Sequence, residues 1–125
     1  MTLPALLAAA LADLARKQET IGYGALARRL AIPGPGSIAT LTRALEALMA
    51  EDAAAGRPFR AALCEGKLRG GLPAPGFFEA AQRLGRFSGP FDGPEAEAFV
   101  ASERAALFAA QDPWRRGLSL RPGMP

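Results

Sequence analysis

Two kinds of side chain could carry chemistry in this 125-residue chain: a single cysteine and a surplus of arginine. Cys64 is the residue type that can act as a thiolate nucleophile, but the chain has no histidine to serve as its general base or as a metal ligand. Glu65 follows it directly, and a neighbouring carboxylate disfavours a thiolate. We therefore expect Cys64 to be a small apolar residue on a buried strand. We expect no catalytic residue, metal or cofactor.

The charges are unevenly distributed along the chain. The net charge is +3, and arginines make up most of the 15 basic residues. Residues 57–87 carry six basic and two acidic groups, whereas residues 88–112 carry five acidic groups and one arginine. This distribution has two interpretations. Either the basic segment faces phosphate and the acidic helix packs beside it with the opposite charge, or the charges of both signs are simply exposed to solvent.

Composition and length indicate one folded domain. Half of the residues are hydrophobic and 22% are charged, which is ordinary for a soluble protein. The apolar run 3–14 is interrupted by Asp13 and is too short to cross a membrane. We expect a single domain over residues 1–110, a flexible basic tail over residues 111–125, and a cytoplasmic location.

Apolar spacing and capping residues predict a mainly helical α+β fold. Thr2 can cap a first helix that fades near Gln18, and Gly85 can end a later one. A short strand or extended segment is expected over residues 20–23. The expected helices cover residues 3–18, 24–30, 37–50, 77–84 and 94–110.

The segment from Ile21 to Leu45 has the pattern of a helix-turn-helix. A two-turn helix is followed by a Pro-Gly-Pro-Gly turn and by a second helix for which Ser37 is the expected N-cap. In such a unit the second helix is presented to a partner, most often DNA. Its expected buried face is Ile38, Leu41, Leu45, Leu48 and Met49. The polar Thr40 and Arg43 lie away from the centre of that face.

A wing is expected beside this unit. The segment 59–64 is a candidate strand, and residues 65–67 form a tight turn into a second short strand. Lys67 and Arg69 on this hairpin would contact phosphate. Arg28 and Arg29, on the first helix of the unit, either contact phosphate or keep a short helix in solution. The predicted fold is a winged helix-turn-helix-like core with additional flanking helices.

Three short motifs in residues 18–85 carry a resemblance to a known family. They are Tyr23-Gly24-Ala25-Leu26-Ala27, then Arg43-Ala44-Leu45-Glu46, then Gly70-Gly71-Leu72. In this order they resemble motifs of the winged-helix DNA-binding domain of O6-alkylguanine-DNA alkyltransferases and alkyltransferase-like proteins. The family's reactive Pro-Cys-His-Arg motif is absent, since the nearest segment here is Leu63-Cys64-Glu65-Gly66. The resemblance therefore implies DNA binding without alkyl transfer to Cys64.

The resemblance also implies roles for two residues. In that family the protein approaches DNA from the minor groove and flips out a nucleotide, with a tyrosine against the target phosphate and an arginine filling the gap in the stack. By position these residues would be Tyr23 and Arg43. Flipping costs a few kcal/mol of unstacking, which an inserted side chain and a base pocket offset.

The sequence thus predicts a non-enzymatic protein that binds double-stranded DNA. The expected contact residues are Tyr23, Arg28, Arg29, Ser37, Thr40, Arg43, Lys67 and Arg69. Two alternatives stay open at this point: a half-buried Tyr23 bonded to the backbone, and an Arg43 that faces solvent or pairs with Glu46. The alternative function is a protein-interaction adaptor, docking a partner helix or forming a homodimer through the alanine-rich first helix and the acidic last helix. No membrane role is expected.

Overall fold

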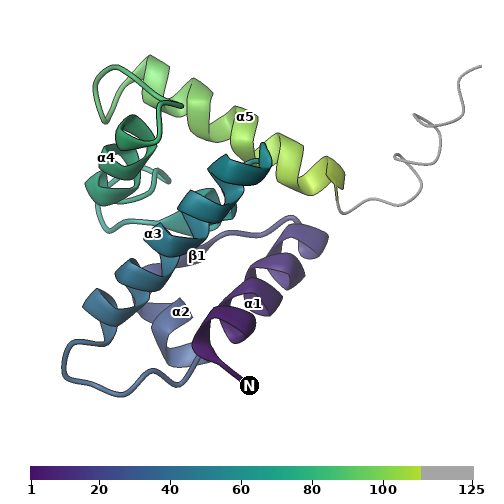
Figure 1. Cartoon of the computed structure of the whole chain (residues 1–125). Helices are drawn as coiled ribbons and strands as arrows, with labels where there is room; N and C mark the ends of the chain where they lie inside the picture. The colour runs from purple at the N-terminus through teal and green to yellow at the C-terminus, as the bar shows by residue number, and fades with distance from the viewer. Residues whose placement is uncertain (111–125) are drawn as a thin grey trace, which may run out of the picture.

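The computed structural model describes residues 1–110, which form a mainly helical α+β fold (Figure 1). This agrees with the predicted fold class, and the tail predicted over residues 111–125 lies outside the described residues. Within residues 1–110, no helix is both long enough and apolar enough to span a membrane. In chain order the elements are α1 (Leu3–Lys17), β1 (Ile21–Gly22), α2 (Tyr23–Arg29), α3 (Ser37–Ala55), the 3-10 helix η1 (Arg60–Leu63), β2 (Cys64–Glu65), α4 (Pro75–Arg83) and α5 (Pro94–Ala110).

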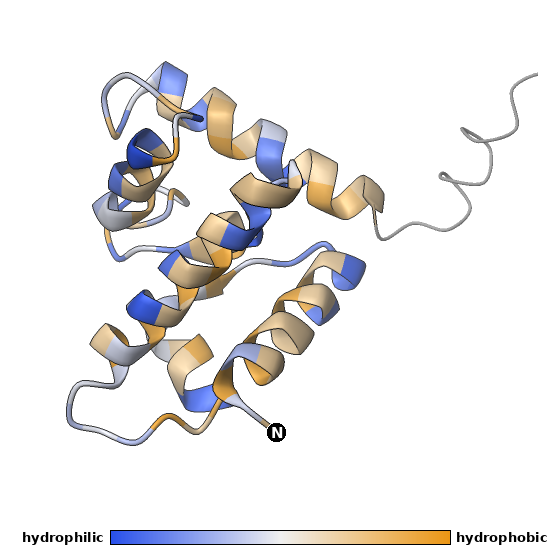
Figure 2. Cartoon of the chain, in the orientation of Figure 1, coloured by the Kyte–Doolittle hydropathy of each residue, from blue (hydrophilic) through white to orange (hydrophobic). Residues whose placement is uncertain are grey.

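Helix α1 begins and ends where its capping residues predict. The Thr2 hydroxyl accepts a hydrogen bond from the Ala5 N–H at 3.3 Å, and Gln18 takes a left-handed conformation after the last turn. Its buried stripe includes Leu7, Leu11 and Leu14. Figure 2 shows hydrophobic residues along most of α1 and hydrophilic residues near its C-terminal end. The stripe packs α1 against α3, α5 and η1.

Helices α2 and α3 pack against each other across the turn 33–36. The predicted N-cap of α3 was wrong by one residue: Gly36 is the cap, and Ser37 is the first helical residue. The reason is that Gly36 has φ 83°, a left-handed conformation that glycine adopts without strain. The predicted buried face of α3 is also corrected at one position, because Ile38 in the first turn is 46% exposed.

The predicted hairpin wing is not formed. Residues 60–63 are a 3-10 helix instead of a strand, and the Lys67–Leu68 segment is a turn. The two-residue strand β2 pairs in parallel with β1, through Ile21 opposite Cys64. A parallel partner from far along the chain therefore replaces the adjacent antiparallel strand that the sequence suggested.

Three charged side chains explain why the segment around η1 needs no further strand partner. The Asp52 carboxylate accepts the Arg60 N–H at 3.0 Å, and the Glu103 carboxylate accepts the Phe59 N–H at 2.9 Å. Arg104 donates to the Ala62 carbonyl at 2.8 Å. Side chains from α3 and α5 thus satisfy backbone groups that a sheet would otherwise pair. This allows η1 to lie buried between α1, α3 and α5.

Helices α4 and α5 follow the predicted bounds closely. Apolar spacing predicts that α5 buries Phe99, Val100, Ala106 and Leu107; Val100 and Leu107 are buried, whereas Ala106 is exposed and Glu103 is buried instead. Glu103 is buried because it also pairs with the Arg86 guanidinium at 2.7 Å. A cluster of aromatic rings joins both helices to η1 and the intervening loops: Phe59, Phe77, Phe78, Phe87, Phe91 and Phe99.

Candidate nucleic-acid interface

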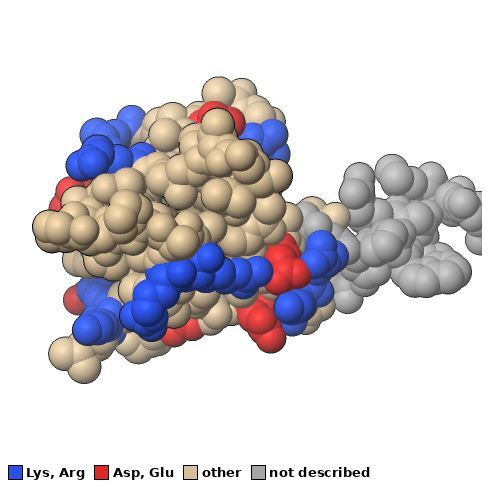
Figure 3. Space-filling model, turned by 90° about the horizontal axis from the view of Figure 1, so that it is seen from below, with Lys and Arg blue, Asp and Glu red and all other residues tan. Residues whose placement is uncertain are grey.

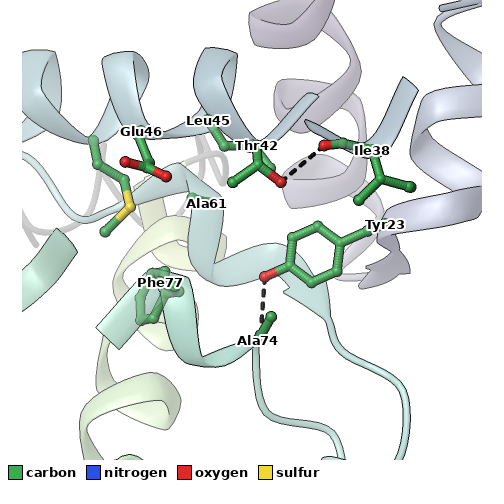
Figure 4. A pocket seen from close by; sticks show the side chains of 10 residues that line it. Tyr23, Ile38, Thr42, Leu45, Glu46, Ala61, Ala74 and Phe77 are labelled. Carbon is green, nitrogen blue, oxygen red and sulfur yellow. Dashed lines mark hydrogen bonds between the residues drawn. The ribbon is translucent and has the colours of Figure 1, made fainter. Parts of the chain in front are cut away.

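Two neighbouring hollows lie at the N-terminal end of α3, and Tyr23 and Ile38 line both of them. The smaller is an apolar pocket of about 120 Å³ between α3 and the start of α4 (Figure 4). The larger is an open depression of about 640 Å³ between α2 and β2. The apolar pocket is lined by Tyr23, Ile38, Thr42, Leu45, Glu46, Met49, Ala61, Ala74, Gly76 and Phe77. The open depression is lined by Gly22, Tyr23, Gly24, Ala25, Arg28, Ile38, Glu65 and Lys67.

Tyr23 is half-buried at the first position of α2, with its hydroxyl directed toward the backbone before α4 (Figure 4). The hydroxyl oxygen accepts the Ala74 N–H at 3.0 Å, which confirms the alternative of a half-buried ring with a backbone partner. Burial, with a smaller contribution from Cys64, raises the pKa of Tyr23 to about 12. The phenol therefore stays neutral, and its own proton is available to donate to a ligand.

The exposed residues of α3 are Ile38 in its first turn, several alanines around Arg43, and the acidic Glu51. Ala39, Ala47 and Ala50 are exposed on this helix, and Arg43 lies among them. Arg43 faces solvent, as one part of the alternative predicted. Its pairing with Glu46 does not occur, because Glu46 pairs with Arg83 of α4 at 3.1 Å. Within residues 1–110 the Arg43 side chain forms no ion pair or hydrogen bond.

Arg28 and Lys67 face the open depression from opposite elements, α2 and the turn after β2. Both are exposed, and in the described part of the chain neither side chain has an ionic partner. Glu65 also lies in this depression, but its carboxylate accepts the Thr20 hydroxyl and lies in the field of Arg104. Viewed from below, basic side chains form a band across part of the surface, with acidic groups adjoining it (Figure 3).

The other residues expected at the interface are less available to a ligand. Arg29 is exposed but pairs with Asp13 at 2.8 Å. Arg69 is half-buried and donates to the carbonyls of Pro73, at 3.1 Å, and Phe91. Ser37 and Thr40 are half-buried in the first turn of α3. The structure therefore brings Tyr23, Arg28 and Lys67 together around one hollow, whereas Arg43 lies on another side of α3 and lines neither hollow.

Cys64 is fully buried at the start of β2, as a small apolar residue would be. Burial raises the pKa of the Cys64 thiol to about 12, although Arg104 acts in the opposite direction. Burial is thus the cause of the raised pKa, and not the neighbouring carboxylate that the sequence suggested. At neutral pH the thiol is protonated and out of reach of a substrate.

We expect the Cys64 thiol to react with a disulfide reagent only when the protein opens. At pH 8 the native protein should be labelled at least about 100-fold more slowly than the unfolded chain, because both access and thiolate are lacking. The measurement is the rate of thiol release from an aromatic disulfide, with and without guanidinium. Rapid labelling of the native protein would contradict this assignment.

Sequence reasoning missed the residues that shape the pocket between α3 and α4. Thr42 donates to the Ile38 carbonyl at 2.8 Å, Glu46 lies at the rim, and Ala74 holds the Tyr23 hydroxyl. A helical pattern could have placed Thr42 and Glu46 on one side of α3, four residues apart. No pattern could have brought Ala74 to Tyr23.

Comparison of this chain with models of protein families, with curated proteins and with solved structures finds no match.

Proposed function

We propose that this protein binds double-stranded DNA without sequence specificity, with α3 lying against a groove of the duplex. The observation that carries the proposal is the exposed side of α3, where the unpaired Arg43 stands among alanines. Alanine side chains allow a helix to approach a groove closely. They offer no hydrogen bonds to base edges, so sequence readout by this face is minimal.

The depression beside α3 supplies the contacts to phosphate. Arg28 and Lys67 line it from two elements, and neither forms an ion pair among residues 1–110. Glu65 also lines it, but its carboxylate accepts the Thr20 hydroxyl. Phosphate contacts from such basic residues dominate the affinity of a non-specific DNA-binding protein and make it dependent on salt. Arg29 and Arg69 do not belong to this set, because the Arg29 guanidinium pairs with Asp13 and the Arg69 guanidinium donates to the Pro73 carbonyl.

The resemblance to alkyltransferase-like proteins adds a finer proposal, an interface that accepts a flipped nucleotide. Tyr23 and the apolar pocket support it, because the pocket adjoins a neutral hydroxyl with a proton to donate. A base out of its stack needs an apolar enclosure, and its phosphate needs a donor. The buried Cys64 supports binding without alkyl transfer.

The test is the affinity for a random-sequence duplex, measured by fluorescence anisotropy as a function of salt. With Arg28 and Lys67 on phosphates, log Kd should rise with log salt with a slope of about 2. Arg43→Ala should weaken binding about tenfold at low salt, since an inserted arginine contributes more than a surface charge.

Arg16→Ala is the matched control, because Arg16 is an exposed arginine on α1 that pairs with Asp13. It should change the affinity less than about twofold. Absence of binding at low salt, or equal effects of the two substitutions, would overturn the proposal. Light scattering on the same samples reports whether the protein forms a homodimer, which is one form of the alternative function.

A further inference from the structure

The turn between β2 and the segment before α4 carries an apolar side chain that the fold does not use. Leu68 is fully exposed, although leucine is normally among the buried residue types. Its φ is 55°, a left-handed conformation that a branched side chain rarely adopts and that glycine or asparagine would favour. Exposure and conformation thus both disfavour leucine at this position. Leu68 is both exposed and in an unfavourable backbone conformation, and no contact within residues 1–110 compensates for this. Such a residue indicates a role in binding a partner.

The turn is held rigidly, so Leu68 projects from a fixed base. The Gly66 N–H donates to the Leu72 carbonyl at 2.9 Å and closes the turn. Next to Leu68, Arg69 is anchored on the carbonyls of Pro73 and Phe91, and its guanidinium lies 5.8 Å from the centre of the Phe78 ring. A side chain on such a base can be driven into a partner with little loss of conformational entropy.

The surroundings of Leu68 specify the chemistry of that partner. Lys67 precedes it and lines the open depression together with Arg28. Across the depression, the first turn of α3 contributes the 46%-exposed Ile38. Among the described residues, the depression thus holds two cations and an exposed apolar group, and its one carboxylate, that of Glu65, accepts the Thr20 hydroxyl. Cations next to exposed apolar groups match a polyanion with apolar surfaces between its charges, such as stacked base pairs between two phosphate backbones.

We infer that Leu68 is a wedge that enters a base step of the bound duplex while Lys67 contacts the flanking phosphate. The inference rests on the proposed DNA binding and adds a second point of insertion to the one that Arg43 would make. An apolar wedge partly unstacks the step and kinks the duplex, and the energy it recovers is that of removing its own surface from water.

The experiment compares wild type with Leu68→Asn and with the control Leu6→Ala, which removes an exposed leucine from α1. The probe is a duplex containing 2-aminopurine, whose fluorescence rises when its stack opens, and donor and acceptor dyes at the ends report bending. Wild type and Leu6→Ala should raise the fluorescence and bend the duplex. Leu68→Asn should do neither, and should bind about tenfold more weakly.

Thermal unfolding separates this role from a structural one. Asparagine suits the left-handed conformation, so Leu68→Asn should be at least as stable as wild type while losing the unstacking signal. If Leu68→Asn binds DNA and opens the stack as wild type does, the wedge is wrong and the proposed function stands. If wild type does not bind the duplex at all, both fail. If Leu68 is required for binding phosphatidylserine vesicles and not DNA, the loop is a membrane contact and the inference is overturned.

Discussion

Asp52→Ala should lower the free energy of unfolding by about 3–4 kcal/mol, because it leaves buried donors without an acceptor. Asp52 is fully buried, and its carboxylate accepts the Arg60 N–H at 3.0 Å and pairs with the Arg60 guanidinium at 2.8 Å. It also pairs with Arg57 at 3.0 Å. One carboxylate therefore holds the start of η1 against α3. Since small domains are stable by about 5–15 kcal/mol, this loss is a large fraction of the total.

Asp13→Ala is the matched control for this prediction. Asp13 also contacts three cations, Arg16, Lys17 and Arg29, but it lies at the surface. These cations lower the pKa of Asp13, Arg29 most of all. Water replaces such contacts readily, so we expect a much smaller change. Urea unfolding measures the free energy of unfolding of both variants. Asp52→Asn takes the place of Asp52→Ala if the alanine variant does not fold. Equal losses for Asp13 and Asp52 would contradict the structural role of Asp52.

Arg104→Met should cost about 3 kcal/mol, because it removes a cation that holds backbone carbonyls. The Arg104 guanidinium donates to Ala62 and Gly71 at 2.8 Å, and to Cys64 at 3.5 Å. Methionine keeps the length of the side chain but has no donor. Arg104 joins η1 to the turn at Gly71, so both segments would lose this common anchor.

The control for Arg104 is Arg83→Met, since Arg83 is exposed and makes an ion pair with Glu46. We expect its urea midpoint to stay close to that of wild type. Trypsin provides a second readout, because Lys67 lies in the turn next to the carbonyls that Arg104 holds. Cleavage after Lys67 should be faster in Arg104→Met than in Arg83→Met. If both variants unfold and are cleaved alike, Arg104 is not the anchor described here.

The helices could be predicted from sequence because their signals are local. Thr2, the leucines of α1 and the glycines after α3 and α4 act within a few positions of the turns they determine. The residues of α3 that line the pocket follow from helical spacing in the same way. The exposure of Arg43 follows from its place away from the apolar stripe.

The features of the fold and the site that could not be predicted depend on contacts between residues far apart in the sequence, which no local pattern contains. Glu97 and Glu103 lie on the same helix, yet only Glu103 is buried, because Phe59 and Arg86 meet it there. For the same reason η1 was expected to be a strand: its short apolar run suits either structure until its hydrogen-bond partners are known. The pairing of Tyr23 with Ala74 joins residues 51 positions apart.

The dependence of η1 on α5 has a consequence for how the chain acquires its structure during synthesis. The hydrogen-bond partners of the Phe59 N–H and of the Ala62 carbonyl are the side chains of Glu103 and Arg104, which are synthesised later. When residues 1–65 have left the ribosome, these polar groups still need water, and burying them would be costly. The hydrophobic interior between α1 and α3 can therefore close fully only after the last described helix has emerged, so the order of translation and the order of assembly differ.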